Sequence, residues 1–125
     1  MQIIFDSMTG NVRRFSQALG DVCGLPALDL KQNVPEGSFL LVTYTFGRGD
    51  VPVSTQRFLE QHAAGLCGVV SSGSFHWGEN FARAGDQIAA RYSVPLIAKI
   101  NKSGSEADKR TITDWLTGWL EENRG

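Results

Sequence analysis

Hydrophobic residues along the chain follow two alternating patterns. The first is a near-continuous apolar run rich in β-branched residues, which is typical of a strand buried on both faces of a sheet. Such runs occur at Gln2–Phe5, Phe39–Tyr44, Gly68–Ser71 and Leu96–Ile100. A weaker run at 27–30 follows Pro26. The pattern therefore predicts five strands.

The second pattern is an apolar residue at every third or fourth position, as on one face of an amphipathic helix. Four groups show it: Val12, Phe15 and Leu19; Phe58, Leu59 and His62; Phe81, Ala84, Ile88 and Tyr92; Ile112, Trp115, Leu116, Trp119 and Leu120. Ser105 and Asp108 predict a capping box at the start of the last helix, and Pro52 suits the first turn of the second.

Strands and helices thus alternate, which predicts an α/β fold with a parallel sheet and helices on both faces. A chain of 125 residues fits one domain, so we expect residues 1–125 to form a single unit. Ligands of such sheets bind beyond the carboxyl ends of the strands. The loops at 6–11, 45–51 and 72–79 are predicted to meet there.

Composition narrows the class of function. Hydrophobic residues make up 42% of the chain and charged residues 20%, as in ordinary globular proteins. Twelve basic against thirteen acidic residues argue against nucleic-acid binding. A basic leader and a long apolar span are lacking, so we expect neither export nor a membrane partner. Cys23 and Cys67 lack zinc or disulfide spacing, which favours reduced thiols in the cytoplasm and no metal.

The first loop has the chemistry of an anion-binding site. Ser7, Thr9 and Asn11 offer polar donors, and Gly10 lets backbone N–H groups approach a ligand at a helix N-terminus. The lysine of a Walker loop and the GxGxxG spacing are both missing, which disfavours a nucleoside triphosphate or NAD. The alternative that Ser7 and Thr9 only cap the helix stays open.

The other two loops combine aromatic and small residues. The segment 43–50 reads TYTFGRGD, and 72–80 reads SGSFHWGEN. Stacking on a planar ligand would explain an indole at Trp77 in a loop, although a single loop aromatic more often folds back on the core. His76 either meets the edge of such a ligand or is simply exposed to solvent.

A phosphate loop beside two aromatic loops suits a flat heterocycle that carries one terminal phosphate. Flavin mononucleotide (FMN) fits this description best. Other chemistries lack their residues, because the chain has no CxxxxxR motif, no GxSxG elbow and no carboxylate pair spaced for a metal.

Several of these segments resemble the NrdI family, which are small flavodoxin-like FMN proteins that serve class Ib ribonucleotide reductase. They are SMTGN after the first strand, TYT with its following glycines, SG with the later WGENF, and VPL before a Ser-Gly-Ser turn. The similarity runs from about Ile3 to the last helix. It implies a flavodoxin-like three-layer sandwich with a five-stranded parallel sheet in the order 2-1-3-4-5.

The resemblance also implies an activity and a site. Reduced flavin would convert O2 to superoxide, which assembles the dimanganese-tyrosyl radical cofactor of the reductase's radical subunit. By position, the phosphate would be held by Ser7, Met8, Thr9, Gly10, Asn11 and Val12. The ring and its N5 edge would be lined by Thr43, Tyr44, Thr45, Phe46 and Gly47, with Gly47 near N5. The opposite side would be formed by Ser72, Gly73, Ser74, His76, Trp77 and Gly78.

Two positions depart from the family pattern. Ser74 stands where many members have Asn, which removes one side-chain contact to the ring. The turn before the last helix, in which an acidic residue and a leucine are common, reads Ile100-Asn101-Lys102-Ser103-Gly104 here, which alters the partner surface or its charge.

Two other functions stay open. An electron-transfer flavodoxin typically surrounds its flavin with acidic residues, which disfavour the anionic hydroquinone. Here the charges of Arg48, Asp50 and Glu79 in the two ring loops nearly balance, so the anionic hydroquinone is less disfavoured. This balance favours the oxidant-generating protein. A domain without flavin, whose glycine loops only form a docking surface, is the other alternative, and the colour of the purified protein would exclude or support it.

Overall fold

The computed structural model describes residues 1–123, apart from the side chains of residues 75–77. The strands are β1 (Gln2–Phe5), β2 (Ala27–Asp29), β3 (Phe39–Tyr44), β4 (Leu66–Gly73) and β5 (Leu96–Asn101). The α-helices are α1 (Asn11–Cys23), α2 (Val53–His62), α3 (Arg83–Tyr92) and α4 (Glu106–Glu122). Two short 3-10 helices, η1 (Ala63–Gly65) and η2 (Phe75–Asn80), lie in the connections around β4. The nine predicted strands and helices are all present.

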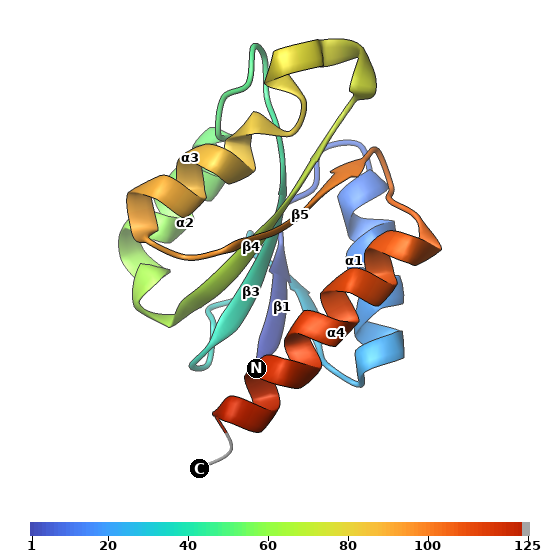
Figure 1. Ribbon diagram of the computed structural model, residues 1–125. Helices are drawn as coiled ribbons and strands as arrows, with labels where there is room; N and C mark the ends of the chain where they lie inside the picture. Colours follow the sequence, from blue (N-terminus) through green and yellow to red (C-terminus); the bar gives the residue numbers. More distant parts are fainter. Residues whose placement is uncertain (124–125) are drawn as a thin grey trace.

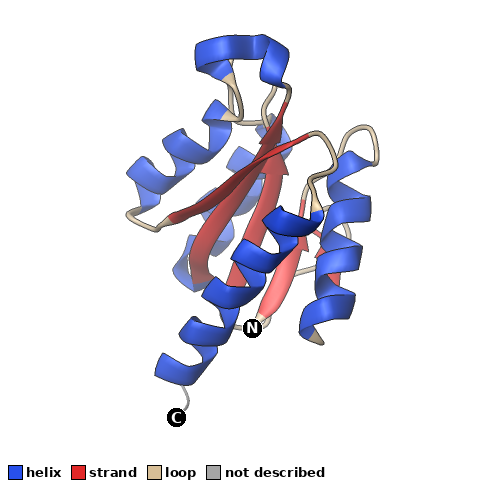
Figure 2. Cartoon of the chain, turned by 45° about the vertical axis from the view of Figure 1, so that its right-hand side comes forward, coloured by secondary structure: helices blue, strands red, loops and turns tan. Residues whose placement is uncertain are grey.

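The strands form one parallel sheet in the order β2-β1-β3-β4-β5. Helices α1 and α4 cover one face, and α2 and α3 cover the other (Figure 1). Figure 2 shows the same three layers from a second direction. The predicted flavodoxin-like sandwich and its strand order are therefore confirmed.

Each face of the sheet has its own hydrophobic core. Alternate residues of β1 point to opposite faces, so that Ile3 and Phe5 pack under α1 and α4, whereas Ile4 packs under α2 and α3. Both cores are drawn from side chains that are buried almost completely. This double burial explains why the central strands read as continuous apolar runs.

Strand β5 lies at the edge of the sheet and is less buried than the central strands. Five of its six residues are half-buried, so the prediction of a strand buried on both faces is wrong there. The reason is that β5 has a neighbouring strand on only one side. Strand β4 is also longer at both ends than the predicted 68–71.

Two residues predicted to belong to helices lie just before them. The apolar pattern included Phe81, but α3 begins at Arg83, because Ala82 has a left-handed backbone conformation (φ 51°) that a right-handed helix does not contain. Pro52 is the N-cap of α2 and so precedes the first turn. The capping box of α4 is confirmed, since Asp108 N–H donates to Ser105 Oγ and Ser105 N–H donates to Asp108 Oδ2.

Backbone hydrogen bonds tie the carboxyl ends of three strands together. Thr45 N–H donates to the Ser72 carbonyl at 2.9 Å, and Lys102 N–H donates to the Gly73 carbonyl at 2.8 Å. The chain segments that leave β3, β4 and β5 are thereby held next to one another. Within residues 1–123, no helix has the length and apolar character needed to cross a bilayer.

Candidate functional site

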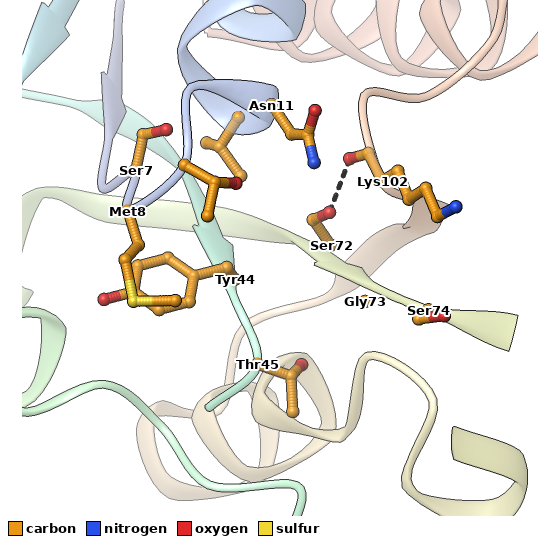
Figure 3. A pocket seen from close by; sticks show the side chains of 11 residues that line it. Ser7, Met8, Asn11, Tyr44, Thr45, Ser72, Gly73, Ser74 and Lys102 are labelled. Carbon is orange, nitrogen blue, oxygen red and sulfur yellow. Dashed lines mark hydrogen bonds between the residues drawn. The ribbon is translucent and has the colours of Figure 1, made fainter. Parts of the chain in front are cut away.

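A pocket of about 200 Å³ opens at the carboxyl ends of the central strands. Four segments that are far apart in the sequence line it: the β1–α1 loop, the end of β3, the end of β4 and the turn after β5 (Figure 3). The lining residues are Ser7, Met8, Thr9, Asn11, Val12, Tyr44, Thr45, Ser72, Gly73, Ser74 and Lys102. Residues from all three predicted loops thus meet in one pocket.

The β1–α1 loop brings a helix N-terminus to this pocket. Gly10 is the N-cap of α1, with a left-handed backbone (φ 92°) that glycine adopts without strain, and its N–H donates to Ser7 Oγ at 3.1 Å. The first N–H groups of a helix have no partner inside it, and the helix dipole places partial positive charge at this end. The pocket wall at Asn11 and Val12 is therefore suited to an anion.

The side chain of Asn11 is oriented by a charged neighbour. Arg14 Nη2 donates to Asn11 Oδ1 at 2.6 Å. Because the amide oxygen is bonded in this way, the amide nitrogen faces the pocket, on the side of Ser72 (Figure 3). Asn11 consequently offers two more N–H donors to a ligand.

Tyr44 and Thr45 form the wall at the end of β3. Figure 3 shows Tyr44 and Met8 on the same side of the pocket. Thr45 is buried, and its Oγ1 accepts from Ala84 N–H at 3.3 Å, which ties this wall to α3. Burial, and secondly the nearby Asp6 carboxylate, raise the pKa of the Tyr44 hydroxyl above its usual 10.0, while a hydrogen bond with Ser54 opposes the shift.

The opposite wall joins the end of β4 to the turn after β5. Ser72 Oγ donates to the Lys102 carbonyl at 2.6 Å, the bond drawn in Figure 3. Gly73 cannot carry a side chain without movement of the backbone, because a Cβ there would lie 2.6 Å from Ala82 N. Lys102 has a left-handed backbone (φ 55°), and its exposed side chain adds a positive charge to the pocket rim.

Some predicted residues lie away from this pocket lining. Thr43 is fully buried, and its hydroxyl bonds to Thr55 Oγ1 at 2.8 Å. Phe46 and Gly47 lie in the exposed β3–α2 loop, where Phe46 pairs with Asp50 in a short bridge and Gly47 has a φ of 57°.

Three further predicted residues belong to η2. Gly78 is exposed, with a φ of 54° and a ψ of −122°. The side chains of His76 and Trp77 lie outside the described part of the chain.

Lys102 is the pocket residue that the sequence patterns did not assign to the site. It follows the carboxyl end of β5, so the rule that selected the other loops applies equally to this turn. Among the residues that the structure describes, no group of three or more His, Cys, Asp or Glu side chains is arranged to hold a metal ion.

Comparison with known proteins identifies the family. Residues 3–114 match the family described as "NrdI Flavodoxin like". The chain is 47% identical over 121 residues to a protein called "Protein NrdI" from Deinococcus radiodurans, which covers 97% of this chain and 86% of the relative. The chain belongs to the NrdI family of flavodoxin-like proteins. A second NrdI relative, from Bacillus licheniformis, is 40% identical over 113 residues, with 90% of this chain and 85% of the relative covered.

Solved structures show the same fold at much lower identity. A short-chain flavodoxin associated with a non-canonical PDU bacterial microcompartment superposes with a TM-score of 0.76 and 18% identity, and the match covers 97% of this chain and 96% of that one. A Fusobacterium nucleatum flavodoxin bound to flavin mononucleotide gives a TM-score of 0.65 and 17% identity over 97% and 96% of the two chains. The NrdI family chain therefore has the flavodoxin fold.

Proposed function

We propose that this chain binds FMN in the pocket at the carboxyl ends of β1, β3 and β4. The observation that carries the proposal is the pocket itself, which joins the N-terminus of α1 to the Tyr44 wall in a chain of the NrdI family. The fold relative from Fusobacterium nucleatum binds FMN, which supports a flavin of the same class here.

The donors present fit a phosphate monoester. The hydroxyls of Ser7 and Thr9, the amide of Asn11 and the first N–H groups of α1 lie at one end of the pocket. Gly10 has the backbone conformation that lets a loop of N–H groups face an anion. We assign phosphate binding to residues 7–12, and Lys102 adds favourable charge at the rim.

The remaining walls fit a planar ring. Tyr44 and Thr45 lie on one side and residues 72–74 on the other, and we propose that the isoalloxazine ring lies between them. In this arrangement Phe46 and Gly47 flank the N5 edge, and residues 76–78 cover the outer part of the ring. Thr43 supports the Tyr44 wall from the core through its bond to Thr55.

The proposed activity follows from the family. When bound and reduced, FMN supplies electrons, one of which converts O2 to superoxide. Membership of the NrdI family supports delivery of this oxidant to a manganese-loaded radical subunit of class Ib ribonucleotide reductase. Arg48, Asp50 and Glu79 are all exposed, so solvent screens these three charges of the pocket-side loops.

Cofactor binding is tested by comparing FMN with riboflavin. The purified chain is stripped of flavin and titrated with each compound while flavin fluorescence is followed. We expect tight binding of FMN and weak binding of riboflavin, because only FMN carries the dianion that the α1 N-terminus stabilises. Equal affinities would refute the phosphate assignment.

The activity is tested with the partner itself. The FMN-loaded protein is reduced without oxygen and mixed with a manganese-loaded class Ib radical subunit, and O2 is then admitted. Electron paramagnetic resonance should detect a tyrosyl radical that depends on both O2 and this protein. An equal radical yield without the protein would refute the activator role, and rapid delivery of single electrons to another acceptor would favour an electron-transfer flavodoxin.

A further inference from the structure

A lysine with no carboxylate partner lines the pocket. Among the described residues of the lining, Lys102 alone carries a charge, and the others are neutral polar, apolar or glycine residues. The salt bridges between described residues join other lysine and arginine side chains to carboxylates. Within the described part of the chain, Lys102 is therefore an uncompensated positive charge at the pocket rim.

The backbone of Lys102 is fixed against the wall that we assign to the ring. Its N–H donates to the Gly73 carbonyl at 2.8 Å, and its carbonyl accepts from Ser72 Oγ at 2.6 Å. Both partners belong to β4 and line the pocket. Because both bonds use backbone atoms of Lys102, they hold this residue in place whichever side chain it carries.

The side chain of Lys102 lies at the ring end of the pocket. Figure 3 shows its ammonium on the side of Ser74, whereas Ser7 of the β1–α1 loop lies across the pocket. The left-handed backbone (φ 55°) contributes to this arrangement, because it sets the direction in which the side chain leaves the turn. The charge of Lys102 is thus placed beside the proposed position of the ring.

We propose that Lys102 makes the pocket bind reduced FMN in preference to oxidised FMN, and so raises the reduction potential of the bound flavin. This inference rests on the proposed function. On full reduction the ring takes up two electrons and one proton and then carries one negative charge, which a nearby cation stabilises. The oxidised ring is neutral, and the phosphate is charged in both states, so only the ring can make the effect of Lys102 depend on reduction.

The direction of this effect agrees with the other charges near the site. Arg48, Asp50 and Glu79 nearly balance, which leaves a negatively charged ring less disfavoured than an acidic surrounding would. A cation at the pocket rim favours the reduced ring further. A protein that holds fully reduced flavin until O2 arrives requires this preference.

Substitutions at Lys102 grade the charge at one position. The full-length protein is loaded with FMN, and its midpoint potential is measured by anaerobic titration with a chemical reductant and a reference dye, at about 0.01 M salt, where screening is weak. Lys102→Met should lower the affinity for reduced relative to oxidised FMN about fivefold, the scale of one exposed charge pair, or about 20 mV for a two-electron couple. Lys102→Glu should lower the potential about twice as far, and Lys102→Arg should keep the parent's potential because it keeps the charge.

The matched control is Arg91→Met. Arg91 is an exposed cation in the last turn of α3, at the end of the helix that leads into the start of β5, whereas the pocket lies at the carboxyl ends of the strands. Its removal changes the net charge by the same amount and should leave the potential unchanged. Raising the salt to about 1 M should shrink the difference between Lys102→Met and the parent, because the Debye length falls to about 3 Å.

The outcomes separate the inference from the function. A lowered potential in Lys102→Met and a still lower one in Lys102→Glu, with Lys102→Arg and Arg91→Met at the parent's value, support the inference. Equal potentials in all variants overturn it while leaving FMN binding intact. A loss of affinity for oxidised FMN but not for riboflavin, without a change in potential, also overturns it, because Lys102 would then bind the phosphate. A parent protein that takes up no FMN overturns the proposed function and the inference with it.

Discussion

A methyl group added at Gly10 tests the phosphate loop directly. Gly10 has a φ of 92°, and a left-handed conformation costs an L-residue roughly 1–2 kcal/mol. Steric collision adds little, because the nearest atom to the new Cβ would be Arg14 Nη1 at 3.1 Å, at the flexible end of an exposed side chain. Gly10→Ala should therefore still fold.

The strain should appear in FMN binding. A free loop can relax away from the strained conformation, whereas bound phosphate requires the original arrangement of N–H groups. A cost of about 1–2 kcal/mol borne on binding weakens FMN affinity by roughly 5-fold to 30-fold. The assay is a fluorescence titration with FMN and with riboflavin, which lacks the phosphate and should bind the variant and the parent equally.

Gly24 provides the matched control at the other end of the same helix. It is the C-cap of α1, has a φ of 70°, and offers open space to a Cβ, with no heavy atom within 4 Å of where that carbon would lie. Gly24→Ala should lose about 1–2 kcal/mol in the free energy of unfolding and keep its FMN affinity. If Gly10→Ala bound FMN as tightly as Gly24→Ala does, Gly10 would be only a helix cap and the phosphate assignment would be wrong.

Three further predictions concern the last helix, the pocket wall at Tyr44 and the loop after β4. Ser105→Ala should lower the free energy of unfolding, measured in urea, by about 0.5–2 kcal/mol through loss of the capping box with Asp108, and no loss would contradict that role. Because the pKa of Tyr44 is raised, the folded state favours the neutral phenol. The stability that this hydroxyl contributes to the folded state is complete below pH 10.0 and is lost as the pH rises through the folded-state pKa. Tyr44→Phe should therefore lose less stability in alkaline titration, and identical alkaline curves would exclude this effect. Trp77→Ala should weaken FMN binding by about 1–3 kcal/mol and abolish most of the quenching of tryptophan fluorescence by bound FMN. An unchanged dissociation constant would assign Trp77 a structural role.

Local patterns were enough to predict the elements and the layers of this fold. Central strands of a doubly covered sheet must be apolar on both sides, so β1 and β3 were located to the residue. The capping box of α4 could also be predicted from the sequence, because Ser105 and Asp108 interact within one turn of the helix. The loop for which we propose phosphate binding was visible for the same reason, since its polar donors and its glycine are consecutive.

Features that depend on contacts between distant segments were not predictable in this way. The half-buried state of β5 follows from its edge position, and the late start of α3 follows from the conformation of Ala82. Lys102 reaches the pocket because hydrogen bonds hold its backbone to residues about thirty positions earlier. The spacing of hydrophobic residues along the chain does not predict such contacts between distant segments.

Asp6 shows the division between the two sources most clearly. In the sequence it is one acidic residue that follows a strand and precedes a loop with anion-binding chemistry. Only the folded chain brings Ser54 and Thr55 of α2 and Lys31 after β2 around its carboxylate. The sequence determined that a polar loop follows a buried strand, because hydrophobicity is a local property. The tertiary structure decided that this carboxylate is buried against the first turn of α2, because burial and electrostatic fields depend on distance in space and not along the chain.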